Sequence, residues 1–337
     1  MANPVVSDIL TFGQRDLLDY ITLVDMKDTP FFTLLPKGST PDAVTVEWPV
    51  DNQVAPTSAI NAGAVDGTDI SDFDSYQDDY AILSNKVQWF RNAVMIGEMA
   101  ETVQNQAGIP RQRAYAIKKK MEQLKRQVEI RISGDDEMQA PTGTNPSQFR
   151  GIGKWIQATA QSVSPVPTAH LVPTASVYTG TLAALTETNL QAVLTSQYSV
   201  TGQTRTRQLI VGTSLKQNFT SYIRTQTSSA NVMSSARFFT APVDAKKIVN
   251  TVDVYVGDFG TYELLPSLWL NYSFTNALGD IRRGYAIDTE RWQLSFVHPM
   301  KIKELPDQGG GERFMVHTKL TLKCLNPRDQ AKFASTS

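Results

Sequence analysis

Residues that could carry out catalysis are few in this sequence and lie far apart. The histidines are His170, His298 and His317, and no two of them have the spacing that zinc sites use. The single cysteine, Cys324, excludes an intrachain disulfide and is typical of a small buried apolar residue. No paired carboxylates and no nucleophile–base arrangement stand out, so we expect a protein without enzymatic activity, metal or cofactor. Each histidine is expected to be an ordinary surface or strand residue.

Two further patterns suggest ligand sites but match their templates poorly. Gly151-Ile152-Gly153-Lys154 has the glycines of a phosphate loop, but it lacks the third glycine of a dinucleotide loop and the spacing of a P-loop. The aspartate run from Asp66 to Asp79 lacks the ligand order of an EF-hand, which disfavours calcium. The run is expected to be either a solvated acidic loop or a docking surface for a basic partner.

Charge is distributed unevenly, although the formal net charge of the chain is only −1. Residues 41–80 contain nine acidic and no basic residues, which gives a net charge of −9. Residues 109–133 contain eight lysines and arginines and two glutamates, which gives +6. The acidic candidates for contact with a partner are Asp66, Asp69, Asp72, Asp74, Asp78 and Asp79. The basic candidates are Arg113, Lys118, Lys119, Lys120, Lys125 and Arg126.

The N-terminal part of the chain is expected to form an arm, residues 1–40. Gln14 to Val24 has helical periodicity, and Thr29-Pro30 is typical of a helix start. Phe31 and Phe32 crowd the short turn that follows. Their rings need burial, either as a lid on the chain's own core or in a socket on a neighbouring copy.

A long hairpin and a long helix are expected to carry the two charged regions. Residues 41–97 predict the hairpin: Val44 to Trp48 alternates like a strand, Pro49 is expected to end it, and Ala81 to Ile96 is strand-like again. Residues 109–133 predict a helix with one apolar face and basic residues on the others.

The remaining sequence predicts mixed helix and strand structure. Residues 186–289 have an α/β texture, with a helix from Asn189 to Tyr198 and a strand from Gln208 to Val211. Residues 290–337 predict return strands, of which Phe314 to Cys324 alternates like a half-buried strand.

Bulk properties fit a globular protein. The 337 residues, 41% of them hydrophobic, suffice for two domains or one elaborate domain. No basic-then-apolar leader opens the chain, and no apolar run reaches about 18 residues, so neither a signal peptide nor a membrane span is expected.

The order of these pieces resembles that of the major capsid proteins of tailed bacteriophages with the HK-97-like fold. The stretches that carry the resemblance are Thr29-Pro30-Phe31-Phe32, Val46-Glu47-Trp48-Pro49-Val50-Asp51, Gly151-Ile152-Gly153-Lys154-Trp155-Ile156, Val252-Asp253-Val254-Tyr255-Val256-Gly257-Asp258-Phe259-Gly260 and Leu320-Thr321-Leu322-Lys323-Cys324-Leu325-Asn326-Pro327. Each is weak alone, and together they span nearly the whole chain. The resemblance implies an α+β fold with four parts. These are the N-terminal arm (1–40), an extended loop (41–97), a peripheral domain (98–185 and 290–337) with spine helix 109–133, and an inserted α/β axial domain (186–289).

The resemblance also implies a function. Copies would self-assemble as pentamers and hexamers into an icosahedral shell around double-stranded DNA, in a virion assembled in the host bacterial cytoplasm. Implied partners are further copies, separate scaffolding, portal and decoration proteins, and DNA contacted non-specifically on the inner face, with no membrane. Because the arm begins almost at once, we expect scaffolding to be separate or absent. The chain has no lysine between Lys37 and Lys86, so the loop is not expected to supply an isopeptide cross-link near its tip.

Alternatives from other classes stay open on the sequence alone. An encapsulin-type compartment would use the same fold, and a secreted carbohydrate-binding or hydrolytic β-rich protein belongs to another class. In the capsid hypothesis, the acidic loop of one copy docks on basic surface of the next, with helix 109–133 as the first candidate. The basic face of that helix could instead face packaged DNA.

Overall fold

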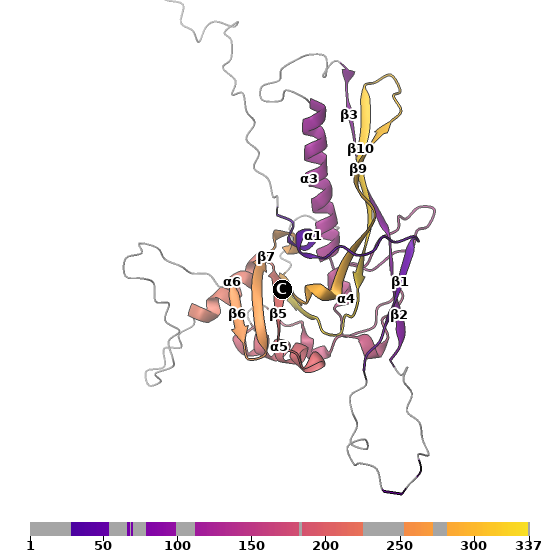
Figure 1. Ribbon diagram of the computed structural model, residues 1–337. Helices are drawn as coiled ribbons and strands as arrows, with labels where there is room; N and C mark the ends of the chain where they lie inside the picture. Colours follow the sequence, from indigo (N-terminus) through magenta and orange to yellow (C-terminus); the bar gives the residue numbers. More distant parts are fainter. Residues whose placement is uncertain are drawn as a thin grey trace, which may run out of the picture. The chain divides into compact units, whose positions relative to one another are not determined.

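The computed structural model describes residues 28–53, 66–67, 69, 79–98, 112–181, 184–224, 253–271 and 282–335. The chain forms two compact units, whose elements are labelled in Figure 1. The smaller unit contains Arg91–Leu124 and Lys301–His317. The larger unit contains Asp28–Phe90, Lys125–Met300 and Thr318–Ser337. The expected helix within Gln14 to Val24 lies outside the described residues.

The described chain contains both helices and strands. The helices are α1 Pro30–Leu34, α3 Gln112–Ser133, α4 Ile152–Trp155, α5 Glu187–Thr201 and α6 Thr213–Arg224, with short 3-10 turns η3 Thr168–His170, η4 Thr174–Ser176, η5 Leu268–Asn271 and η6 Thr289–Arg291. The strands are β1 Thr45–Val50, β2 Ala81–Lys86, β3 Gln88–Ile96, β4 Val177–Tyr178, β5 Arg205–Val211, β6 Val254–Gly257, β7 Gly260–Pro266, β8 Arg282–Ile287, β9 Trp292–Leu305, β10 Glu312–Cys324 and β11 Ala331–Ser335.

The strands form three sheets in the described part of the chain. Their orders are β1-β2, β3-β10-β9 and β4-β11-β8-β5-β7-β6. In the six-stranded sheet, β5 runs parallel to β7 and antiparallel to β8, and β11 lies between β4 and β8. The sheet therefore combines parallel and antiparallel pairs.

The base of the expected hairpin is an antiparallel pair, β1 and β2. Its register runs from Thr45 opposite Lys86 to Val50 opposite Ala81. Pro49 was expected to end the first strand, but β1 continues through it to Val50. Proline is tolerated here because β1 pairs with β2 alone, so its missing N–H can point away from the ladder. The segment from Ala81 to Ile96 was expected as one strand and is divided between β2 and β3, which belong to different sheets.

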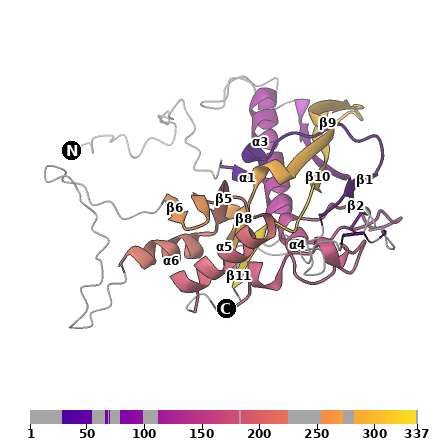
Figure 2. The same ribbon diagram turned by 60° about the horizontal axis from the view of Figure 1, so that its bottom comes forward.

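Helices α5 and α6 pack on one face of the six-stranded sheet, next to its strands in Figure 2. Helix α5 begins where Thr186 accepts a hydrogen bond from the backbone N–H of Asn189, and it ends at Gly202, whose φ of 62° needs a residue without a side chain. The core between helices and sheet contains Leu190, Val193, Leu194, Leu209, Val211, Leu215, Phe219, Tyr262, Leu264 and Phe333. The inward residues of α5, Leu190, Val193 and Leu194, follow the apolar spacing of a helix.

The opposite face of the sheet packs against the end of α3. The Tyr285 hydroxyl donates a hydrogen bond to the backbone carbonyl of Ser133 at 2.9 Å. Lys332 of β11 is buried, and its Nζ lies 2.8 Å from a carboxylate oxygen of Asp135 and 2.8 Å from the carbonyl of Gly153. Burial lowers the pKa of Lys332, and the negative charge of Asp135 opposes that shift.

Two strands of this sheet come from segments that were assigned to the peripheral domain. Strand β4 precedes residue 186, and β11 follows residue 290, yet both pair within the six-stranded sheet. The axial segment 186–289 supplies the other four strands. The boundaries expected from the sequence therefore do not coincide with the membership of this sheet.

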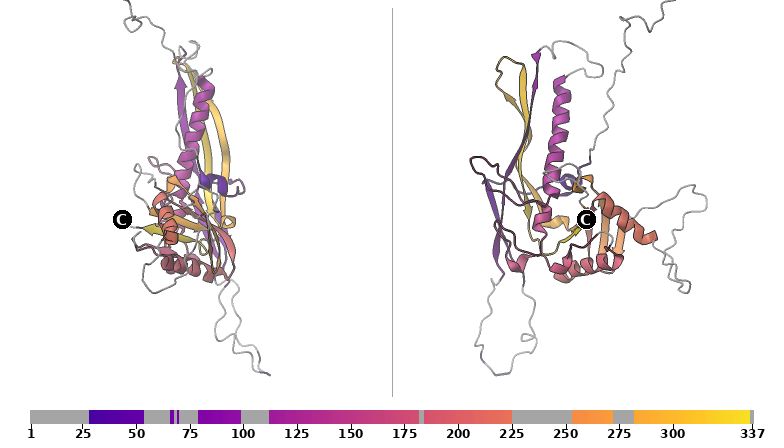
Figure 3. Two further views of the ribbon diagram at one scale, coloured as in Figure 1. Left: turned by 90° about the vertical axis from the view of Figure 1, so that its left-hand side faces the viewer. Right: turned by 180° about the vertical axis from the view of Figure 1, so that it is seen from behind.

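The smaller unit contains the tip of the β9–β10 hairpin and the N-terminal half of α3, which are shown from two sides in Figure 3. The turn uses Gly309 and Gly311, whose φ angles are 83° and 118°. A side chain at Gly311 would also collide with the backbone of Ile96 and Gly97. Glycine is thus required at this turn both by its conformation and by the close approach of β3.

Candidate subunit-contact surfaces

Helix α3 presents lysines to solvent along its outer faces. Lys118, Lys119 and Lys125 are exposed, while Leu124 and Val128 on the opposite side are fully buried. Residues 109–111 of the expected helix lie outside the described part. Among the described residues, none forms an ion pair with these three lysines. Their charge is therefore available to a partner.

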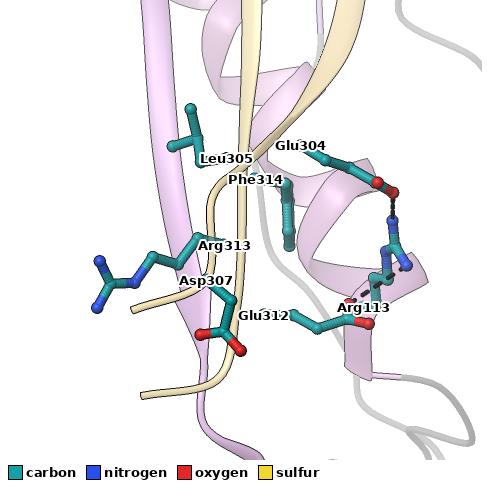
Figure 4. A pocket seen from close by; sticks show the side chains of 7 residues that line it. All are labelled: Arg113, Glu304, Leu305, Asp307, Glu312, Arg313 and Phe314. Atoms are coloured by element: carbon teal, nitrogen blue, oxygen red, sulfur yellow. Dashed lines mark hydrogen bonds and ion pairs between the residues drawn. The ribbon is translucent and has the colours of Figure 1, made fainter. Parts of the chain in front are cut away.

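Other basic residues of α3 already have partners in their own chain. Arg113 forms ion pairs with Glu304 and, at 3.2 Å, with Glu312 of the β9–β10 hairpin (Figure 4). The same side chains line a small open pocket together with Leu305, Asp307, Arg313 and Phe314. Lys120 donates to the side-chain oxygen of Gln123 at 2.9 Å. Arg126 is half-buried.

Two charges that the sequence assigned to the helix surface are in fact internal. Arg131 is buried and donates to the carbonyl of Phe149, and Asp136 lies 3.4 Å away. Burial lowers the pKa of Arg131, and the nearby carboxylates oppose that shift. Glu129 is fully buried as well. Because one of these internal charges is positive and the other negative, the net charge of +6 over residues 109–133 is the same without them.

The acidic candidates are described only in part. Asp66 and Asp69 are exposed, and Asp79 is half-buried where the chain returns to β2. Asp72, Asp74 and Asp78 lie outside the described residues. The structure does not bring the described aspartates together with the α3 lysines by any contact within one chain.

The two phenylalanines of the arm differ in their exposure. Phe31 is 0% exposed, and its ring lies 6.2 Å from that of Tyr285, edge to face. Of the two alternatives for this ring, the structure therefore favours the lid on the chain's own core, and Phe31 is withdrawn as a residue that contacts a neighbouring copy. Phe32 is half-buried against Phe296 at 6.1 Å.

Helix α1 is fixed to α3 by a buried carboxylate. Oε1 of Glu129 accepts a hydrogen bond from the N–H of Phe31, and Oε2 accepts one from the N–H of Phe32, both at 2.8 Å. Thr29 occupies the N-cap position predicted for it, but its side chain makes no capping hydrogen bond. The carboxylate of Glu129 takes over the role that a capping side chain usually has.

A buried histidine lies where the extended loop leaves the β1–β2 pair. His170, expected on the surface or in a strand, is 0% exposed and ends the 3-10 turn η3. Its Nδ1 lies 2.8 Å from Nδ2 of Asn52, and its Nε2 lies 2.6 Å from the carbonyl oxygen of Asp79. Asn52 and Asp79 lie on opposite sides of the loop. This contact could not be predicted from the sequence, because its partners are distant along the chain.

Comparisons with known proteins then decide the family. The family of SU10 major capsid proteins matches residues 5–337. This chain belongs to that family. Three solved capsid structures share its fold at low identity. The capsid of cyanophage A-1(L) is 12% identical, with 97% of each chain covered and a TM-score of 0.64. The capsid of a native GTA particle is 8% identical, with 100% of each chain covered and a TM-score of 0.61. The capsid of cyanophage P-SCSP1u is 11% identical, with 100% of this chain and 96% of that chain covered and a TM-score of 0.60. Comparison with curated protein sequences gave no match.

As a major capsid protein, the chain is a structural subunit that forms the virion shell by association with further copies. The expected HK-97-like capsid fold is confirmed. The family decides against the encapsulin and the secreted carbohydrate-binding or hydrolytic alternatives.

The glycine-rich stretch of the capsid protein is a packing device. A Cβ on Gly151 would lie 2.3 Å from the carbonyl oxygen of Gly134, and one on Gly153 would lie 2.4 Å from the Tyr285 hydroxyl. Gly151 thus allows α4 to approach the end of α3, and Gly153 allows it to approach Tyr285 of β8. In the described part of the capsid protein, no cluster of three or more His, Cys, Asp or Glu could hold a metal ion, and no helix is long and apolar enough to cross a membrane.

Proposed function

We propose that the shell consists of pentamers and hexamers of this capsid protein around double-stranded DNA, and that the acidic loop of one copy docks on α3 of the next. The receiving residues are Lys118, Lys119 and Lys125. Assembly takes place in the host bacterial cytoplasm, with separate scaffolding, portal and decoration proteins, and the protein has no enzymatic activity.

The docking proposal rests on a difference in ion pairing among the basic residues of α3. Arg113 and Arg131 have carboxylate partners in their own chain. The three lysines are exposed and have no such partner among the described residues. The loop carries Asp66 and Asp69, both exposed, within a segment of net charge −9.

Single exposed ion pairs contribute only about 0–1 kcal/mol and are screened by salt. In a closed shell, the same contact repeats at every copy, so modest pairs add up to a large effect on lattice closure. Without a partner, each charged surface would repel its own copies as subunits crowd together. Docking removes both repulsions.

A second function for the helix is contact with packaged DNA. Phosphate recognition needs only positive charge, which Lys118, Lys119 and Lys125 supply in an exposed row. Docking and DNA contact differ in what they predict for shells that form without DNA. Docking requires the lysines in empty shells, and DNA contact does not.

The test uses shells assembled from purified full-length protein without DNA. Asp66→Lys with Asp69→Lys should reduce shell yield at low salt, measured by sedimentation and electron microscopy. Adding Lys118→Glu with Lys119→Glu should restore part of the yield, because opposite charges meet again. Lys301→Glu with Lys303→Glu is the matched control, since these exposed lysines of β9 carry the same charge change elsewhere. Parental yield in the aspartate double variant would refute the docking.

A further inference from the structure

We call the two ends of the extended loop, at Asn52 and Asp79, its neck. A hydrogen-bonded network around His170 holds this neck. Nδ2 of Asn52 lies within 2.8 Å of His170 Nδ1 and donates to the carbonyl of Ala169 at 3.0 Å. Oδ1 of Asn52 accepts from Nδ2 of Asn326 at 2.7 Å. His170 Nε2 reaches the carbonyl oxygen of Asp79 at 2.6 Å. The network therefore joins the end of β1, the start of β2, the turn η3 and the turn after β10.

These partners define the protonation of the imidazole ring. The carbonyl oxygen of Asp79 can only accept, so His170 Nε2 must carry the proton and donate it. The amide nitrogen of Asn52 can only donate, so His170 Nδ1 is the acceptor. The orientation of the Asn52 amide is supported independently, because its oxygen faces the amide nitrogen of Asn326. Both ring nitrogens thus have a hydrogen-bond partner in a fully buried position.

The position of the ring relative to the β1–β2 ladder is informative. The last pair of that ladder is Val50 with Ala81. If the ladder continued in the same register, Asn52 would lie opposite Asp79, two residues beyond the last pair. These are the two residues that His170 bridges. The imidazole thus occupies the place where the two strands would otherwise go on pairing.

We propose that His170 is a positioning residue: its ring acts as a wedge that ends the β1–β2 ladder and fixes the direction in which the acidic loop leaves. A neutral imidazole suits this role because it offers one donor and one acceptor on opposite sides of a rigid ring. The turn η3 holds the ring in place through the bond from His170 N–H to the Pro167 carbonyl at 2.9 Å. The consequence for assembly rests on the proposed docking of the loop.

The closing experiment measures the geometry of the neck in the unassembled full chain. Spin labels are placed at Gln53→Cys and Ser199→Cys, both exposed positions of the larger unit, in a Cys324→Ala background. Double electron–electron resonance then gives the distribution of distances between them. His170→Ala should widen that distribution by about twofold, because the neck loses its fixed partners. His170→Gln, which keeps one donor and one acceptor, should restore much of the parental width.

Two controls separate positioning from general damage. His298→Ala removes the same ring from an exposed position and should leave the distribution unchanged. Asn52→Ala removes the amide but keeps the imidazole and should widen the distribution as His170→Ala does. Denaturant unfolding of each variant should show a folded body. A parental width in His170→Ala, or loss of the fold in both His170→Ala and Asn52→Ala, would overturn the proposal.

Shell yield of the same variants, without spin labels, tests the consequence for assembly. His170→Ala should lower the yield by about tenfold, and His170→Gln should recover it. A widened neck with parental shell yield would overturn the role of this positioning in assembly. A parental yield in Asp66→Lys with Asp69→Lys would instead refute the docking, while the resonance result for the neck would stand.

Discussion

Glu129 binds the backbone of Phe31 across almost a hundred residues of sequence, with Oε1 accepting the Phe31 N–H at 2.8 Å. The second carboxylate oxygen accepts from Phe32, so one side chain satisfies two donors at the start of α1. Because Phe31 is buried against Tyr285, this contact also fixes the lid that covers the sheet. The arm is thereby joined to α3 by two hydrogen bonds from backbone N–H groups to one carboxylate.

Removal of both acceptors should destabilise the unassembled subunit. Glu129→Leu keeps the side-chain volume roughly constant but leaves the buried N–H of Phe31 and the part-buried N–H of Phe32 without their acceptors. At pH 5, we expect its free energy of unfolding to fall by about 2–4 kcal/mol, and that of Glu129→Gln by about 1 kcal/mol. Denaturant unfolding measures both. Glu122→Gln, on the same helix but not buried, is the control and should change stability by less than about 0.5 kcal/mol.

The same residue should make stability depend on pH in an unusual direction. Burial raises the pKa of Glu129 from 4.5 to about 7, more than the two hydrogen bonds lower it. Between pH 4.5 and about 7, the folded protein therefore binds more protons than the unfolded chain. The contribution of Glu129 to the free energy of unfolding falls over this range, by on the order of 3 kcal/mol, and is constant above it.

Glu129→Gln does not titrate, so its stability curve should cross that of the parent. The variant should be the less stable protein at pH 5 and the more stable one at pH 8. Parallel curves for the two proteins from pH 5 to pH 8 would contradict the raised pKa.

Close packing of α4 predicts the effect of a single added methyl group. The Cβ of Gly151→Ala would lie 2.3 Å from the carbonyl oxygen of Gly134 and 2.9 Å from that of Arg131, and backbone atoms cannot rotate away. We expect the free energy of unfolding to fall by about 3 kcal/mol or more. Gly143→Ala, with nothing within 4 Å of the added group, should change it by less than about 0.5 kcal/mol. Equal unfolding midpoints for the two variants would be inconsistent with this packing.

Cys324 should play no part in the integrity of the shell. The thiol is fully buried, and burial raises its pKa well above the usual value, so it stays protonated and unreactive. Shells of Cys324→Ser should therefore survive as well as parental shells, with or without reductant. Alkylation by iodoacetamide should be detectable by mass only after unfolding. Disassembly of parental shells on addition of reductant would show that this is wrong.

Periodicity predicted the elements whose partners are local or uniformly apolar. The apolar face of α3 and the inward residues of α5 follow the helical repeat. Strand β10 was predicted from alternation, but Thr321 on its other face is also buried, and its hydroxyl donates a hydrogen bond to the carbonyl of Lys86 at 2.8 Å. A strand covered on both faces cannot be recognised from alternation alone.

Elements stabilised by distant polar partners could not be predicted. Strand β11 contains Lys332, which looks like a solvent-facing residue until Asp135 is placed beside it. Glu129 and His170 were assigned to surfaces for the same reason, since their partners are Phe31, Asn52 and residues far along the chain. Burying a charged or polar side chain costs free energy, so the residue type alone predicts exposure. The sequence does not show the distant contact that offsets this cost.

Strand β11 has a consequence for the timing of synthesis. It is inserted between β4 and β8, so the six-stranded sheet stays open until residues 331–335 have been translated and have left the ribosome. Until then, the edges of β4 and β8 are unpaired and can join strands of other nascent chains on the same message. A subunit is therefore competent to join a capsomer only after β11 has been made and has paired with both strands.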